Sequence, residues 1–264
     1  MKRALRPRVR CGLLVLAGVV AAGMPASARI TRSRPSAAVA PYEGATPSVW
    51  APLYAFVLGG GFEFERSREQ TEYGFPFLIE YNVTEKLKLT LEPKYTSIVA
   101  RSPEARSVKG FGDLETSVAY EFLRERRYRP ALSVEGRIKW PSASDPDLGE
   151  RGRDYTLGLI ASKDLVFMDL DLNILYTSAG DRERDDTVEV SLAAEWHVNR
   201  YVDVIGEVAH VRPMRGRSGE SEATVGLAWH VNKFLKLEQG ERQRRPGERD
   251  RCFHPQRHSP FRFW

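Results

Sequence analysis

Residues 131–165 decide the fold, and they read ALSVEGRIKW, then PSASDPDLGERGRD, then YTLGLIASKDL. In the first part, one parity carries Leu132, Val134, Gly136, Ile138 and Trp140, and the other carries Ser133, Glu135, Arg137 and Lys139. Such alternation with a period of two residues predicts a strand with one apolar and one polar face. A polar loop rich in Pro, Gly and Asp follows, and the alternation resumes at Tyr155. The stretch predicts two amphipathic strands, and the fold depends on which solvent each face meets.

Similar segments recur along the chain. Eleven can be read, at residues 52–66, 72–83, 86–98, 113–123, 131–140, 155–165, 167–177, 187–197, 201–212, 222–230 and 233–239. Short turns and longer polar loops alternate between them, which is typical of an up-and-down barrel with tight turns at one rim. Because bacterial membrane barrels have an even number of strands, the pattern predicts an all-β, up-and-down antiparallel transmembrane β-barrel of about 12 strands.

A short repeat marks two of the predicted turns. Residues 196–201 read WHVNRY and residues 229–234 read WHVNKF, while residues 81–86, YNVTEK, are a weaker copy. Each copy places an aromatic residue on the apolar parity just before a short turn. Amphipathic rings at one rim are typical of an aromatic girdle at a membrane interface. The alternative is a soluble barrel in which these aromatics belong to an ordinary core.

Composition excludes two classes of protein. Charged residues make up 28% of the 264 residues, and the mean hydropathy is −0.42. No segment approaches the roughly 20 apolar residues that a membrane-spanning helix needs, so a helical membrane protein is excluded. The net charge of +5 comes largely from the two ends of the chain. Nucleic-acid binding would require a basic face interleaved with aromatics, and the sequence has none.

The ends of the chain differ from its middle. Residues 1–28 have a basic start, an apolar run and a closing Ala-Ser-Ala, which predicts a secretory signal peptide cleaved after Ala28. The remaining predicted divisions are a flexible segment at residues 29–48, the barrel at residues 49–240, and a basic, Pro-interrupted tail without alternation at residues 241–264. After cleavage only Cys252 remains, so no internal disulfide is predicted.

Five short motifs support a family resemblance. Residues 109–114 read KGFGDL, residues 138–142 IKWPS, residues 148–149 LG, residues 152–155 GRDY and residues 162–165 SKDL. In this order and spacing, they resemble the meta-pathway phenol-degradation family of outer-membrane transport proteins of Gram-negative bacteria. The resemblance implies an outer-membrane β-barrel for the passage of small, often aromatic, compounds, and it supplies no site residues. Ser142 and Ala143 depart from the family, in which Thr-Gly usually follows this proline.

The polar parity supplies the candidate lumen. In a membrane barrel its side chains would point inward, and the eleven candidates are Glu115, Glu135, Arg137, Lys139, Asp169, Asp171, Asn173, Glu189, Glu195, Asp203 and Glu207. Both signs of charge are present, and the interior of a barrel of about 12 strands is narrow. The functional interpretation is a narrow polar path for small solutes. The alternative is an ion-paired plug that never conducts.

The sequence predicts no catalytic residue, no cofactor and no metal ion. Gly110 and Gly112 precede a strand, whereas a dinucleotide site needs a helix there. His197 and His230 hold equivalent turn positions without the spacing typical of a metal site, which favours a structural role at the rim. An outer-membrane phospholipase would need a Ser–His pair facing lipid on neighbouring strands. His210 lies on the apolar parity but Ser191 on the polar parity, so no enzyme is predicted.

The predicted function is passage of small molecules, aromatic or hydrophobic ones among them, across the outer membrane. The expected partners are outer-membrane lipid and a small solute, without nucleic acid, and the oligomeric state is left open. One alternative is a non-conducting barrel with a structural or surface-interaction role. The other is a soluble periplasmic β-barrel, whose apolar face would line a ligand cavity while its charged face meets water.

Overall fold

The computed structural model describes residues 13–20, 56–66, 70–100, 106–215, 218–232 and 235–245. Their secondary-structure elements are all β-strands: β1 (Leu13–Val20), β2 (Phe56–Arg66), β3 (Gln70–Thr84), β4 (Leu87–Glu92), β5 (Lys94–Ala100), β6 (Val108–Phe111), β7 (Leu114–Leu123), β8 (Ala131–Trp140), β9 (Asp154–Asp164), β10 (Met168–Ser178), β11 (Thr187–His197), β12 (Val202–Pro213), β13 (Glu220–Asn232) and β14 (Leu235–Arg245). Among these residues, no helix is long and apolar enough to cross a membrane.

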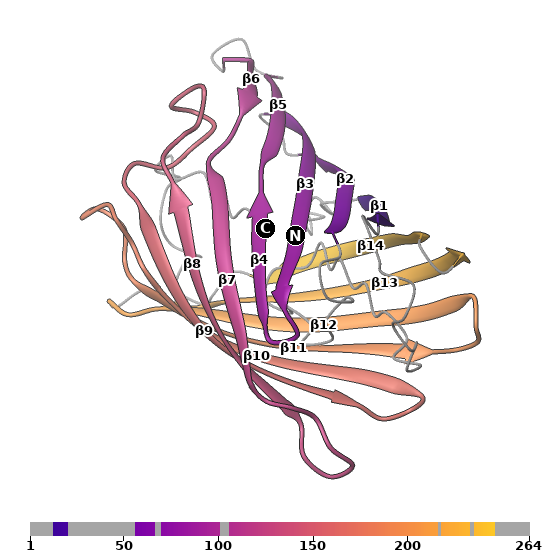
Figure 1. Ribbon diagram of the computed structural model, residues 1–264. Coiled ribbons are helices and arrows are strands. Elements are labelled where there is room, and N and C mark those ends of the chain that lie inside the picture. The colour runs from indigo at the N-terminus through magenta and orange to yellow at the C-terminus, as the bar shows by residue number, and fades with distance from the viewer. Residues whose placement is uncertain are drawn as a thin grey trace, which may run out of the picture.

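The strands form a closed antiparallel ring (Figure 1). From β7 to β14 each strand pairs with the next in chain order, β4 joins β3 to β7, and β2 pairs with β3. β1 lies between β2 and β14 and completes the ring. Of the 14 described strands, only β5 and β6 stand outside the ring, which leaves 12 in it. The predicted all-β, up-and-down antiparallel barrel of about 12 strands is confirmed.

The strand that completes the ring comes from the predicted signal peptide. In β1, Leu13 is the register partner of Gly240 in β14, and Val20 is the partner of Phe56 in β2. Cleavage after Ala28 stays a prediction, and it would remove this strand from the mature chain. The predicted flexible segment at residues 29–48 lies outside the described residues.

Two predicted boundaries shift. β14 continues to Arg245 and so enters the stretch after Gly240 that showed no alternation. The strand forms there without alternation because its backbone pairs with β13, where Ser221 is the register partner of Arg245. The strict alternation of short and long connections fails twice. β2 ends at Arg66 and β3 already begins at Gln70, and the expected short turn at residues 124–130 is longer than the expected long loop at residues 214–219. The rest of the predicted tail lies outside the described residues.

A proline divides one of the predicted segments. The segment at residues 86–98 forms β4 and β5 on either side of Pro93, which has no N–H for the sheet. The long strand β3 pairs with both pieces. The predicted loop at residues 101–112 contains β6, which pairs with β5. β3, β5 and β6 therefore project beyond the ring on the long-loop side (Figure 1).

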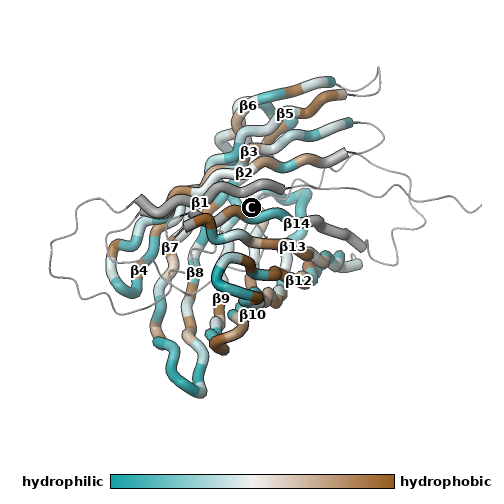
Figure 2. Tube along the Cα trace, turned by 90° about the vertical axis from the view of Figure 1, so that its right-hand side faces the viewer, coloured by the Kyte–Doolittle hydropathy of each residue, from teal (hydrophilic) through white to brown (hydrophobic). Residues whose placement is uncertain are grey.

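The two faces of the ring carry opposite types of residue. Large apolar side chains are exposed on the outside, for example Leu157 at 61% and Val225 at 66%, whereas Glu135 at 3% and Asn173 at 1% are buried. Figure 2 shows hydrophilic and hydrophobic residues alternating along the strands. A soluble barrel would bury its apolar face. The alternative with an apolar cavity and a charged outer face is therefore wrong.

Candidate functional site in the barrel interior

None of the eleven candidate lumen residues is exposed to solvent. Glu115, Glu135, Asn173, Asp203 and Glu207 are buried, and Arg137, Lys139, Asp169, Asp171, Glu189 and Glu195 are half-buried. They come from five strands, β7, β8, β10, β11 and β12, so their contacts depend on the register between strands. Most of their recorded contacts fall into three groups along the barrel, one near the long loops, one in the middle and one near the short turns.

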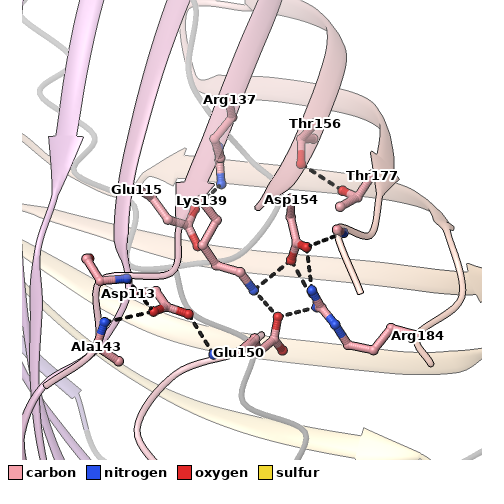
Figure 3. Close-up of polar contacts among 12 residues, drawn as sticks. Asp113, Glu115, Arg137, Lys139, Ala143, Glu150, Asp154, Thr156, Thr177 and Arg184 are labelled. Carbon is pink, nitrogen blue, oxygen red and sulfur yellow. Dashed lines mark hydrogen bonds and ion pairs between the residues drawn. The ribbon is translucent and has the colours of Figure 1, made fainter. Parts of the chain in front are cut away.

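The group near the long loops consists of Lys139, Glu150, Asp154 and Arg184, and is called the loop-side cluster (Figure 3). Lys139 Nζ and Arg184 Nη1 each lie 2.9 Å from Oδ2 of Asp154. Both cations also contact the Glu150 carboxylate. The N–H of Gly180 donates to Asp154 Oδ1 at 2.9 Å. Two cations and two carboxylates therefore balance where loops 141–153 and 179–186 meet.

Asp113 anchors the first of these loops. Its Oδ1 accepts the N–H groups of Ser142 at 3.1 Å and Ala143 at 3.0 Å, and its Oδ2 accepts the N–H of Glu150 at 2.7 Å (Figure 3). The side chain is only 2% exposed. In the same loop, Leu148 is fully buried against β5 and β6. A charged acceptor and an apolar contact therefore hold the loop against the projecting hairpin.

The middle group consists of cross-strand ion pairs. Arg137 lies 3.5 Å from Glu115 on β7 and 3.2 Å from Glu135 on its own strand. Lys88 on β4 lies 2.9 Å from Glu80 on β3. Buried charges need partners of this kind, because an unpaired charge in a low dielectric is costly. The interior is therefore held together by charge pairs as well as by the sheet.

The group near the short turns consists of Asp169, Glu195, His197, Asp203 and His230, and is called the turn-side cluster. His197 Nδ1 lies 3.1 Å from Asp203 Oδ1, and His197 Nε2 lies 3.4 Å from Asp169 Oδ2. The other oxygen of Asp203 contacts His230 Nε2. The carboxylate of Glu195 comes within 4.8 Å of ligand atoms of His197 and Asp203. Four adjacent strands, β10 to β13, supply this group.

Two loop carboxyl groups at the long-loop rim have shifted pKa values. Burial raises the pKa of Glu150, while Lys139 and Arg184 act in the opposite direction. The Tyr176 hydroxyl donates to Asp186 Oδ2 at 2.8 Å and lowers the pKa of Asp186, helped by the N–H of Ala179. The first carboxyl is enclosed and the second is open to solvent, so the two respond differently to acid.

Sequence reasoning missed several of these residues. Asp113 was placed on the polar parity of the segment at residues 113–123 but not among the lumen candidates, and it lies directly before β7. Glu150 and Arg184 lie in connections, where a period of two residues assigns no face. His197 and His230 were considered as equivalent positions, without the carboxylate of Asp203 that both of them contact. The available signal was the repeat, which places His197 and His230 equivalently, with Asp203 in the strand between them.

A Ser–His pair does face outward, contrary to the parity argument that used Ser191. His210 Nδ1 lies 2.9 Å from Ser221 Oγ on the neighbouring strand β13, and both residues are exposed. Ser191 is buried on β11, as its polar parity implied. The serine that pairs with His210 therefore lies on β13, and not on β11, where Ser191 lies. The recorded contacts of His210 include no carboxylate to orient the ring, which a Ser–His nucleophile usually has.

No family model matches the sequence, and no match was found among the curated proteins. Among solved structures, the fold is similar to that of an outer-membrane channel from Pseudomonas putida F1, with a TM-score of 0.49 and 12% sequence identity. The match covers 91% of this chain and 97% of that one. So distant a likeness indicates no function, and the resemblance to the meta-pathway phenol-degradation family stays a prediction.

Proposed function

We propose that the protein is an outer-membrane β-barrel through whose polar interior small molecules pass. The observation that carries the proposal is the inversion of its two faces. Val208 is 56% exposed, while the adjacent Glu207 is 5% exposed. In water, this arrangement would expose a large apolar surface unfavourably. In a membrane, the apolar side chains face lipid and the polar side chains face the interior.

Exposed aromatic rings at both rims support the membrane assignment. Near the short turns they are Phe122, Phe167, Trp196, Tyr201 and Trp229, and near the long loops they are Tyr155 and Tyr176. Tyr and Trp rings prefer the boundary between hydrocarbon and headgroups. The predicted signal peptide would deliver the chain across the inner membrane. By analogy with other such barrels, the short turns would face the periplasm and the long loops the outside.

The eleven candidate lumen residues would line the path. They carry carboxylates, one guanidinium, one ammonium and one amide, so a passing solute would meet groups of both signs. Such a lining can replace part of the hydration of a small polar solute. The family resemblance adds small aromatic compounds as candidates for the solute.

A second candidate is a non-conducting barrel with a structural or surface-interaction role. It is favoured by the pairing of the interior charges, since Arg137 spans two carboxylates and Lys139 contacts two more. Paired charges fill space and give a passing ion little to bind. The two candidates differ in whether correctly folded protein conducts.

The test has two stages. Membrane fractionation and a heat-dependent shift of the folded band on a gel come first, and recovery wholly in the soluble fraction would contradict a membrane barrel. Conductance in planar bilayers follows, and folded wild-type protein should show channel events. Lys139→Met should shift permeability toward cations, because it removes a positive charge from the interior. Lys109→Met on the exposed strand β6 is the matched control and should leave selectivity unchanged. Folded protein without channel events would support the non-conducting candidate.

A further inference from the structure

We propose that the turn-side cluster binds a divalent metal ion with the ligand preferences of Zn²⁺, through Glu195, His197 and Asp203. One ligand atom from each of these residues lies within 4.8 Å of the others. Ligand atoms around a tetrahedral zinc ion are about 3.3 Å apart, so small side-chain rotations would close the site. Ligand binding of this kind is independent of whether solutes pass through the barrel.

Strand pairing places the three ligands. Glu195 and His197 are two residues apart near the end of β11, so they share a face. Asp203 is the register partner of His197 on β12, directly across the short turn. The ligands thus belong to one hairpin whose geometry is fixed by the sheet. A rigid scaffold of this kind is what a metal site requires.

The residues around these ligands match the surroundings of metal-bound histidines. A ligating histidine almost always donates its other ring N–H to a carboxylate or carbonyl. With Nδ1 of His197 facing Asp203 at 3.1 Å, Nε2 faces Asp169 at 3.4 Å. The second oxygen of Asp203 is held by His230. Asp169 and His230 would therefore position His197 and Asp203 from the two outer strands.

The charge of the cluster also favours a cation. Asp169, Glu195 and Asp203 contribute three carboxylates, and Asp203 is only 1% exposed. A neutral imidazole is itself a metal ligand, so His197 can bind an ion beside these carboxylates. Mixed nitrogen and oxygen donors favour zinc and its neighbours over Mg²⁺ and Ca²⁺, which prefer oxygen alone.

The repeat explains how the chain produces this arrangement. The N–H of His197 donates to the carbonyl of Phe167 at 2.9 Å, and the N–H of His230 donates to the carbonyl of Tyr201 at 2.8 Å. Each histidine is thus bonded to the preceding short turn in the same way. Because β12 lies between the two copies, both imidazoles reach Asp203 from opposite sides. Three protein ligands leave one coordination position for water or an exchanging group.

The experiment measures Zn²⁺ binding to refolded, full-length protein in detergent by isothermal titration calorimetry, with a purification tag that lacks histidine. Wild-type protein should bind one equivalent, and His197→Ala and Asp203→Asn should weaken binding at least about 100-fold. Asp169→Asn, which keeps all three ligands, should weaken it about 10- to 100-fold. His210→Ala is the matched control, because this exposed histidine lies outside the cluster, and it should bind as wild type does.

A heat-dependent gel shift identifies the variants that fold. If His197→Ala and Asp203→Asn do not fold, Asp169→Asn still tests the site, because it keeps all three ligands. The proposal is overturned if folded wild-type protein binds no Zn²⁺. It is equally overturned if Zn²⁺ binding is unchanged in the cluster variants or is matched by Mg²⁺. If folded wild-type protein binds Zn²⁺ but shows no channel events, the proposed passage of solutes is contradicted and the metal site is not.

Discussion

The loop-side and turn-side clusters lie at opposite ends of one interior and balance their charges by different means. At the loop side, Lys139 and Arg184 supply permanent positive charges for Glu150 and Asp154. At the turn side, the recorded partners of Asp203 are two imidazoles and a second carboxylate. Ammonium and guanidinium groups stay charged at neutral pH. Permanent cations therefore balance the carboxylates at the loop side, whereas the turn side is where we propose a divalent ion.

The ends also differ in how the backbone is held. At the short turn between β11 and β12, Asn199 Oδ1 accepts two N–H groups, and the N–H groups of His197 and His230 bond directly to neighbouring turns. The long loop at residues 141–153 depends instead on a single carboxylate, Asp113, for three of its N–H bonds. Substitutions should consequently have larger effects at the loop side, provided that they touch the groups that hold the loops.

The largest effect is expected for Asp113→Ala. The change removes a buried acceptor of three N–H groups, and these lose charge-assisted bonds. We expect a loss of about 3 kcal/mol in the free energy of unfolding, with faster proteolysis of the loop. Urea unfolding in lipid vesicles and limited proteolysis measure the two effects. Asp147→Ala in the same loop is the control, since its side chain is 58% exposed. Equal behaviour of the two variants would contradict the anchoring role of Asp113.

The strands that alternation defines were predictable, and they include every strand of the ring except β1. All eleven segments became strands because each carries enough period-two alternation to be seen alone. β6 was not predicted because Val108–Phe111 is too short to show a period. β1 has an apolar run without alternation, which is equally typical of a signal peptide. Its place beside β14 follows from ring closure, a property of the whole chain.

The sequence predicts which residues face the interior, but it does not predict which of them contact one another. Parity assigns Glu135 and Asp203 to the polar face, and both are buried. Their partners depend on the register between strands, which a single sequence does not encode locally. For this reason the sequence showed the repeat containing His197 and His230, but it did not predict that both histidines contact Asp203. Likewise, it showed His210 on the apolar parity but did not predict its contact with Ser221.

Gly152→Ala should have the next largest effect, because it disturbs the contact between the two loops at the loop side. Gly152 has φ of +88°, and an added Cβ would lie 2.6 Å from the carbonyl of Gly180. The left-handed backbone and the collision with backbone atoms together should cost about 2 kcal/mol. Urea unfolding measures this loss. Gly136→Ala is the control, since an added Cβ there meets nothing within 4 Å. A Gly152→Ala protein as stable as this control would mean that the loops do not pack as described.

Arg184→Met should have a smaller effect, and it tests whether permanent cations complete the loop side. The variant leaves Glu150 and Asp154 with Lys139 as their remaining recorded cation. Because the Arg184 side chain is 31% exposed, solvent screens the loss, and we expect about 1 kcal/mol by urea unfolding. The neighbouring exposed residue provides the control Arg182→Met, which should have no measurable effect. An equal loss in both variants would show that general charge, and not the cluster, matters.

Tyr176→Phe should have the smallest effect, visible only in the pH dependence of stability. The Tyr176 hydroxyl lowers the pKa of Asp186 in the folded protein. A lowered pKa stabilises the folded state above the ordinary pKa of aspartate, about 3.9, and this contribution is lost as the pH falls through the lowered value. Wild type should therefore be more stable than Tyr176→Phe near neutral pH, and the difference should close in acid. Urea unfolding across that pH range measures it, with Tyr155→Phe at the same rim as a control. A difference that persists or grows in acid would assign the effect to packing of the ring and not to the ionised carboxylate.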